Sequence, residues 1–301
     1  MIAAPTPPAA ARELLRRRAA RSSTLDFTTY TKPDYQTGWH HRLLCGMLDR
    51  FTAGTLKRGM VFMPPRHGKS ELVSRRLPAF ILGRNPDAQL IACSYSADLA
   101  SRMNRDVQRI IDSPEYPRLF PGTRLSGKNV RSDAGGNFLR NSDLFEVVDR
   151  KGSYRSAGIG GGIVGMGFDH GIIDDYCKSR KEADSPTIRQ AVQEWYSSSF
   201  YTRRAKDAGI LICATRWHED DLCGWLLKQS EEDPLADQWE VLCLPAICEE
   251  EGRYEVDPRK AGEALWPERY PVEELEKTRA ASLYEWSSQY QQHPSPQGSV
   301  E

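Results

Sequence analysis

The chain has 301 residues with 41 basic and 41 acidic side chains, so its formal net charge at pH 7 is zero. This balance excludes a protein whose entire surface attracts nucleic acid by charge, and any polyanion must therefore meet a local basic patch. The composition, 39% hydrophobic and 27% charged, is typical of a folded soluble protein. No apolar run approaches the ~20 residues that a membrane-spanning helix needs.

The first 35 residues predict a basic N-terminal arm. A proline- and alanine-rich start leads into an arginine-rich helix at about 9–21, and a serine- and threonine-rich connector, SSTLDFTTYTKPDY, follows. Residues 1–23 contain five arginines against one glutamate, a net charge of +4. Two interpretations stay open. The arginines form a solvated helix face, or they contact DNA phosphates or a partner.

The order of apolar and basic residues, together with the cysteines, favours the cytoplasm. Apolar residues precede the basic ones at the N-terminus, which is the reverse of a secretory signal. The seven cysteines are scattered, and several lie in apolar runs such as LICAT, where a reduced thiol packs like a small hydrophobic group. We therefore expect a protein of a reducing compartment without a membrane segment.

Residues 36–246 predict an α/β core, because short β-rich runs alternate with longer helical patterns. Such a core consists of a mostly parallel sheet with helices on both faces. The predicted strands are 59–63, 89–95, 143–149, 170–174, 209–215 and 239–245. The predicted helices are 69–82, 98–111, 189–201 and 220–228, the second of them capped by Ser96 or Asp98.

The segment MVFMPPRHGKS predicts a phosphate-binding loop between a strand and a helix. Gly68 allows the backbone to approach phosphates, Lys69 reaches the β- and γ-phosphates, and Ser70 offers its hydroxyl to Mg²⁺. One departure from the pattern G-x-x-x-x-G-K-[ST] is Met63, which stands at the first glycine position. The predicted ligands are ATP and Mg²⁺. The loop residues assigned to them are Pro65, Arg66, His67, Gly68, Lys69 and Ser70.

A second motif, HGIIDD at 170–175, predicts an apolar strand that ends in two carboxylates. In an ATPase, such groups hold Mg²⁺ and polarise the attacking water. Asp174 is the candidate metal ligand and Asp175 the candidate general base, since adjacent strand residues point to opposite faces. Taken alone, paired aspartates at a strand end are more often a turn or a helix cap.

A third motif, GILICATRWHEDD at 209–221, predicts a buried strand with Thr215 and Arg216 at its carboxyl end. Open α/β sheets place their ligand sites at this end of the strands. Thr215 and Arg216 are therefore candidate sensors of the γ-phosphate, which would couple hydrolysis to motion. The alternative is that Thr215 caps a helix beginning near Asp220.

Two further segments have a distinct composition. The glycine-rich stretch 158–167 precedes the second motif, which favours a functional loop over a flexible tether. Residues 247–301 predict a small C-terminal subdomain or linker, poor in strands. From 246 onward the chain contains six basic and twelve acidic residues, a net charge of −6.

Several segments together resemble the large terminase subunit of tailed bacteriophages, the motor that packages DNA. They are PPRHGKS, SYSADLASRMNRDV, LFPG, GGGIVGMGFDHGIIDD, ATRWHEDDL, ALWPERYP and SSQYQQHP. The resemblance implies a P-loop ATPase of the additional-strand (ASCE, RecA/helicase-like) type. It also implies that ATP hydrolysis drives double-stranded viral DNA into a procapsid in the host cytoplasm. The implied partners are DNA, the portal protein, the small terminase subunit and further copies of the chain in a ring, with a monomer possible in isolation.

Carried over by position, the resemblance places the Walker A residues at Lys69 and Ser70 and the Walker B carboxylate at Asp174. Asp175 falls on the catalytic carboxylate, which is Glu in many relatives. Thr215 falls on the coupling motif. Gln36 and Trp39 fall on the upstream element that contacts adenine.

Two arginines are candidates for stabilising charge in the transition state. Arg66 would act in cis from the phosphate-binding loop, and Arg155 would act in trans across a subunit boundary. The residues do not decide between them, and for either one the alternative is a surface salt bridge.

The resemblance also implies a C-terminal nuclease domain, which begins in this family shortly after a sequence like YQQHPSPQG. Since the chain stops there, we expect an ATPase-domain piece without nuclease activity. Two other function classes stay open. One is a small-molecule phosphotransferase, and the other is a non-catalytic assembly protein whose degenerate loop does not bind nucleotide.

Overall fold

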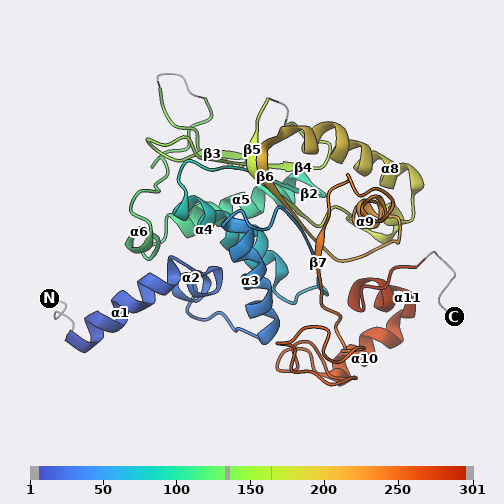
Figure 1. The fold of residues 1–301 in the computed structure, drawn as a ribbon. Coiled ribbons are helices and arrows are strands. Elements are labelled where there is room, and N and C mark those ends of the chain that lie inside the picture. Colours follow the sequence, from blue (N-terminus) through green and yellow to red (C-terminus); the bar gives the residue numbers. More distant parts are fainter. Residues whose placement is uncertain (1–6, 133–135, 164, 296–301) are drawn as a thin grey trace.

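A seven-stranded sheet runs through the computed structural model, which describes residues 7–132, 136–163 and 165–295. The strand order is β3-β4-β2-β5-β6-β1-β7, and all neighbours are parallel except β3 and β4 (Figure 1). The strands are β1 (Arg58–Phe62), β2 (Gln89–Ser94), β3 (Leu144–Glu146), β4 (Ser153–Gly158), β5 (Phe168–Asp174), β6 (Arg204–Ala214) and β7 (Glu240–Cys243). Parts of the predicted arm, glycine-rich loop and C-terminal segment, at 1–6, 164 and 296–301, lie outside the described residues.

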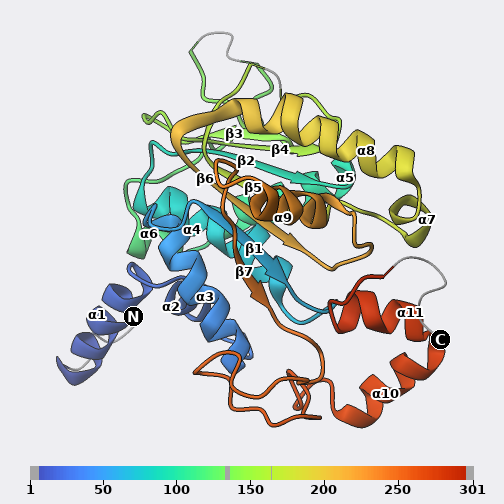
Figure 2. The ribbon, with the colours of Figure 1, turned by 45° about the vertical axis from the view of Figure 1, so that its right-hand side comes forward.

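Helices cover both faces of this sheet. Successive strand residues point to opposite sides, so each face has apolar side chains that a helical layer must bury. On β1, Val61 packs into the core under one helical layer, whereas Met60 and Phe62 pack into the core under the other. Figure 2 shows the two layers. The first contains α3 (Trp39–Thr52), α4 (Leu77–Arg84) and α5 (Ala97–Ile111), and the second contains α8 (Pro186–Trp195), η2 (Tyr196–Phe200) and α9 (Leu222–Glu232). The predicted α/β class is confirmed.

The position of β6 assigns the sheet to the additional-strand type. β6 lies between β1, which leads into the phosphate-binding loop, and β5, which ends in the two aspartates. Val61 is paired with Cys213 on one side of β6, and Ile173 with Ile212 on the other. The three parallel strands therefore end at the same edge of the sheet, so the loops that follow them converge there.

The strand prediction was wrong around 143–158. The strand expected at 143–149 is confined to β3, and β4 was missed altogether. The sequence of β4, SYRSAG, is mostly polar and does not show the apolar alternation of a buried strand. Tyr154 and Ser156 are nevertheless buried. Asn104 of α5 donates a hydrogen bond to the Ser156 hydroxyl at 3.1 Å, which satisfies this polar side chain in the core.

The helix predictions correspond to elements of the structure. Ser96 caps α5, as its hydroxyl accepts from the backbone N–H of Leu99 at 3.3 Å. The helix after the phosphate-binding loop starts with a wide, π-type turn, η1 (Glu71–Arg76), and continues as α4. The cap of α9 is Asp221 rather than Thr215. The short helical segments are α6 (Tyr116–Leu119), α7 (Arg180–Ala183) and η3 (Tyr201–Arg203).

The N-terminal region contains two helices, α1 (Pro7–Ala20) and α2 (Thr24–Thr31). The expectation of a connector after the first helix was wrong, because α2 buries its aromatic side chains in the main core. The ring of Phe27 lies 5.4 Å from that of Phe80 and 6.0 Å from that of Tyr116. In contrast, Leu14 on α1 is 65% exposed.

The chain beyond β7 forms a small C-terminal layer with α10 (Val272–Ala281), α11 (Leu283–Glu285) and η4 (Trp286–Tyr290), seen at the lower right of Figure 1. It has its own apolar cluster, which includes Leu275 and Trp286. Arg180 joins this layer to the α/β core through Glu285 at 2.8 Å and Ser288 at 2.7 Å. Within the described ranges, no helix is both long and apolar enough to cross a membrane.

Candidate active site

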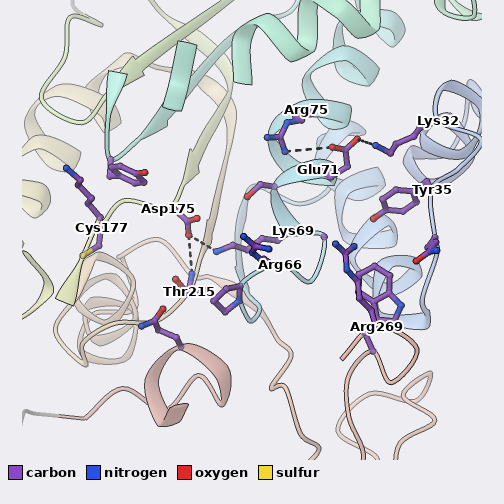
Figure 3. A pocket seen from close by; sticks show the side chains of 18 of the residues that line it. Lys32, Tyr35, Arg66, Lys69, Glu71, Arg75, Asp175, Cys177, Thr215 and Arg269 are labelled. Carbon is purple, nitrogen blue, oxygen red and sulfur yellow. Dashed lines mark hydrogen bonds and ion pairs between the residues drawn. The ribbon is translucent and has the colours of Figure 1, made fainter. Parts of the chain in front are cut away.

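A cavity of about 750 Å³ opens where β1, β5 and β6 end. Most of the predicted site residues line it: Gln36, Pro65, Arg66, Gly68, Lys69, Ser70, Asp175 and Thr215. Figure 3 shows Lys69 and Arg66 between Asp175 on one side and Arg269 on the other. Loops after three parallel strands thus combine at the edge where open α/β sheets bind ligands.

The phosphate-binding loop turns sharply between β1 and the following helix. Arg66 and Gly68 have φ angles of +61° and +94°, so both adopt the left-handed conformation. Gly68 adopts it without a clash because it has no Cβ atom. In Arg66 the Cβ atom crowds the following carbonyl oxygen, so this conformation is sterically unfavourable. The turn places Lys69 and Ser70 in the first helical turn, where free N–H groups and the helix dipole favour an anion.

Lys69 and Asp175 form an ion pair inside the cavity. The Lys69 Nζ donates to Asp175 Oδ1 at 2.6 Å, and the backbone N–H of Thr215 donates to the same oxygen at 3.4 Å. Burial is the largest single influence on Lys69 and disfavours its charge, but Asp175 and the other acidic groups around it, Cys213 and Asp174, together raise the lysine pKa. Asp175 has a φ angle of +51°, so the backbone turns directly after β5 and exposes this side chain.

Asp174 is almost completely buried and contacts the helix that follows the loop. Its Oδ2 accepts a hydrogen bond from Ser74, while its Oδ1 has no hydrogen-bond partner among the described residues. Burial raises the pKa of Asp174, and the Asp175 charge adds to this, whereas Lys69 and the hydroxyls of Ser74 and Ser70 oppose it. An orphaned carboxylate oxygen near a serine hydroxyl is a donor set that suits Mg²⁺.

The cavity has an excess of unpaired positive charge. Lys69 is paired with Asp175, and both Lys32 and Arg75 are within 4 Å of Glu71. Three further cations line the cavity without a carboxylate partner in the part of the chain that the structure describes. These are Arg66, Lys178 and Arg269. A ligand with several negative charges therefore matches this surface.

Comparison with a family model decides the family. The model described as "Terminase large subunit, T4likevirus-type, N-terminal" matches residues 60–285. The chain belongs to the terminase large-subunit family. A comparison with curated proteins found no match.

The chain of this terminase-family protein is also similar to solved phage structures. An arginine-to-alanine mutant of the Thermus phage P74-26 large terminase ATPase domain is 16% identical with a TM-score of 0.49, covering 85% of this chain and 93% of that one. A second structure of that ATPase domain is 17% identical with a TM-score of 0.44, covering 78% and 88%. The HK97 bacteriophage large terminase is 11% identical with a TM-score of 0.42, covering 65% and 38%.

Not all of the predicted site residues line the cavity. Trp39 does not line the cavity. The guanidinium of Arg259 lies over its ring, 5.1 Å from the centroid of the indole. Arg216 is buried in an ion pair with Asp221 at 3.0 Å. His67 and Asp174 are buried and do not line the cavity.

Arg155 lies in a different cavity. This second cavity, of about 1030 Å³, is lined by residues of α5, of the segments 127–131 and 140–143, and of β4. An Nη atom of Arg155 donates to the carbonyl of Gly162 at 2.9 Å, while its buried Nε has no partner in the described ranges. Arg66 and Arg155 thus line two different cavities, and of the two only Arg66 lines the cavity that contains Lys69.

Several residues of the site were missed from the sequence, among them Ser74, Tyr35, Trp266 and Arg269. Ser74 contacts Asp174, and its spacing of four residues from Ser70 on the same helix was the available signal. Tyr35 precedes the predicted Gln36 and lines the cavity. Trp266 and Arg269 also line it, and both belong to ALWPERYP, a segment that contributed to the resemblance without an assigned role.

Proposed function

We propose that this chain is a Mg²⁺-dependent ATPase whose hydrolysis cycle drives double-stranded viral DNA into a procapsid, as the motor domain of a terminase large subunit. The observation that carries the proposal is the ion pair between Lys69 and Asp175. It brings a phosphate-binding cation and a carboxylate able to activate water to one cavity with surplus positive charge. Family membership supplies the DNA-packaging context.

In this proposal, the triphosphate binds at the N-terminal turn of the helix after Gly68. Lys69 leaves Asp175 and neutralises the β- and γ-phosphates, and the released carboxylate orients a water molecule. The water oxygen bonds to the γ-phosphorus while the bond to the bridging oxygen of ADP breaks, and Asp175 accepts the water proton. Mg²⁺, held by Ser70 and Asp174, would neutralise charge on the phosphate oxygens when bound.

Thr215 is the proposed link between hydrolysis and motion. Its backbone N–H contacts the Asp175 carboxylate, and it directly follows β6, the strand between the two halves of the site. A change in the position of Asp175 therefore reaches β6 through one hydrogen bond. We place Gln36 beside the base of the nucleotide, because it lines the same cavity.

The two arginines have different proposed roles. Arg66 is exposed in the cavity of its own chain, and we propose that it stabilises transition-state charge in cis. Arg155 reaches a phosphate only if a neighbouring subunit presents its nucleotide, which requires the ring of copies. The proposed partners are the portal protein and the small terminase subunit, and the proposed location is the host cytoplasm. We also propose that the chain divides into the core 36–246 and the segment 247–301.

Phosphate release from ATP by Lys69→Ala tests the proposal. We expect loss of activity, since this variant removes the buried phosphate cation. The matched control is Lys228→Ala, because Lys228 is exposed and pairs with Glu232 on its own helix. Hydrolysis by Lys69→Ala at the parent rate would refute the site. Tight ATP binding without hydrolysis in the parent would instead favour a non-catalytic assembly role, and phosphate transfer to a small acceptor would favour a phosphotransferase.

A further inference from the structure

Three buried histidines have no role in the proposed chemistry. One is in the phosphate-binding loop, and the other two are in α3, which packs against the loop. His40 and His41 are fully buried near the start of α3, and His67 in the loop is 1% exposed. The ring of His41 is at the centre of the cluster. Its centroid lies 3.9 Å from that of His40, 4.7 Å from that of Trp266 and 5.3 Å from that of Tyr35.

The hydrogen bonds of His41 define its tautomer. The backbone N–H of Gly38 approaches His41 Nδ1 at 2.9 Å, and the carbonyl oxygen of His67 lies 3.0 Å from His41 Nε2. Because an N–H only donates and a carbonyl only accepts, the proton is on Nε2 and the ring is neutral. Burial lowers the His41 pKa to about 4; the hydrogen bond to the His67 carbonyl opposes this, whereas the nearby His67 ring and Arg269 guanidinium lower the pKa further.

The loop needs such support because its own sequence does not favour its shape. Met63 replaces the usual first glycine, and Arg66 adopts a left-handed conformation that costs a non-glycine residue about 1 kcal/mol or more. Strained residues persist only where their surroundings hold them. Here the loop is held by His41, by the contact of His67 Nδ1 with the Pro65 carbonyl at 2.8 Å, and by the ring of Tyr270, 4.7 Å from that of His67.

The contact between α3 and the loop is very close. A Cβ atom on Gly68 would lie only 2.3 Å from His41 Nε2, so this glycine is required by the histidine as well as by its φ angle. In a trans peptide the C=O and the next N–H point in opposite directions. Since the His67 carbonyl points at His41, which does not line the cavity, the N–H of Gly68, a residue that does line it, points away from His41.

We propose that His41 is a positioning residue that holds the phosphate-binding loop in its binding conformation, by donating from Nε2 to the His67 carbonyl. It thereby aims the Gly68 N–H at the phosphates. This inference rests on the proposed nucleotide site. In this inference α3 stabilises the loop conformation, which the loop sequence, with Met63 at its first glycine position, does not stabilise alone.

Three substitutions separate this hydrogen bond from packing. In His41→Gln, the Nε2 amide reaches the position of the imidazole Nε2 and keeps the donor to His67. In His41→Asn, the shorter side chain retains only the acceptor for Gly38. In His41→Phe, the ring remains without either polar atom. The control is His40→Phe, since neither ring nitrogen of His40 has a hydrogen-bond partner within the described ranges.

The measurement is the dissociation constant for ATP with Mg²⁺, together with KM and kcat for hydrolysis, on variants whose thermal unfolding shows a folded protein. We expect about tenfold weaker binding and a raised KM for His41→Asn and His41→Phe, because a buried carbonyl loses its donor. His41→Gln and His40→Phe should bind within about threefold of the parent. Equal binding by all variants, or equal loss in His41→Gln and His41→Phe, would overturn the inference.

The outcome also separates this inference from the proposed function. If Lys69→Ala hydrolyses ATP like the parent, the nucleotide site itself is wrong. If Lys69→Ala is inactive while His41→Asn and His41→Phe bind ATP normally, only the role of His41 is wrong. Should the aromatic variant fail to fold, the comparison of His41→Gln with His41→Asn still decides, because the two differ in which hydrogen bond they retain.

Discussion

The Lys69 ammonium lies 2.6 Å from the Asp175 carboxylate. In this arrangement the cation that would bind phosphate and the carboxylate that would activate water neutralise each other. Incoming phosphate therefore competes with Asp175 for Lys69. In the proposed mechanism, binding of ATP and release of the Asp175 carboxylate are one event, which would prevent Asp175 from acting before the nucleotide is in place.

Arg269 should contribute to nucleotide affinity although it belongs to the C-terminal segment. Its guanidinium lines the cavity without a carboxylate partner in the described part of the chain and rests 5.1 Å from the ring centroid of Trp266. We expect Arg269→Ala to bind ATP about three- to tenfold more weakly, with a reduced dependence on salt. The control is Arg279→Ala, an exposed arginine that is paired with Glu276. Equal affinities for the two variants would exclude a role for Arg269.

Ser74 should support the magnesium site through Asp174. Its hydroxyl donates to the buried Asp174 carboxylate, and loss of that donor makes the charged carboxylate less favourable. We expect Ser74→Ala to require about tenfold more Mg²⁺ for half-maximal hydrolysis, with a kcat near the parent value at saturating Mg²⁺. A magnesium titration of the hydrolysis rate measures this. Ser101→Ala is the surface control, and an unchanged midpoint in Ser74→Ala would contradict the assignment.

The histidine cluster should make the fold sensitive to acid. Burial is the main cause that lowers the pKa of His40 to about 2, and those of His41 and His67 to about 4, from the ordinary value of 6.5. Below pH 6.5 the unfolded chain therefore binds more protons than the folded one, and stability decreases as pH falls towards 4. The maximum slope is about 1.4 kcal/mol per pH unit for each histidine.

Urea unfolding of the parent and His41→Gln between pH 7.5 and 5 tests this dependence. Stability should be nearly constant above pH 7 and decrease below pH 6.5. The variant should show a shallower decrease, because one of the three buried neutral imidazoles is absent. Identical slopes for the two proteins would show that His41 does not remain neutral on folding.

Helix α2 should be part of the folding core. Phe27 is fully buried among the rings of Phe80, Tyr116 and Phe120. We expect Phe27→Ala to lower the free energy of unfolding by about 3–5 kcal/mol, the usual cost of removing a buried aromatic ring. Leu14→Ala, on the exposed side of α1, should change it by less than about 0.5 kcal/mol. Similar small effects of both changes would place α2 outside the core.

The central site was predictable because its signals are local in sequence. β1, β5 and β6 are apolar runs, and each is followed at once by polar residues, so a parallel sheet brings Lys69, Asp175 and Thr215 to one edge. The exposure of Asp175 and burial of Asp174 also follow from their adjacent positions at a strand end. The order of the strands, with β6 between β1 and β5, came from the family resemblance rather than from the pattern.

The remaining features depend on contacts distant in sequence. Arg269 lies two hundred positions after Lys69, and the packing of Trp266 against His41 and of Tyr270 against His67 brings that segment to the cavity. β4 was hidden because its buried face includes Ser156, whose hydroxyl is satisfied by Asn104. Serines and threonines in the region of α2 indicated a connector, although Phe27 buries enough apolar surface to hold a helix there.

The most direct test of the proposed function is Asp175→Asn, measured for both ATP binding and single-turnover phosphate release. The amide keeps the size of the side chain, cannot accept the water proton and no longer holds Lys69 by charge. We expect ATP affinity equal to or above that of the parent, with phosphate release at least about 100-fold slower. The control is Asp149→Asn, an exposed aspartate paired with Arg124. Phosphate release by Asp175→Asn at a rate near that of the parent would contradict the proposal that Asp175 activates the attacking water.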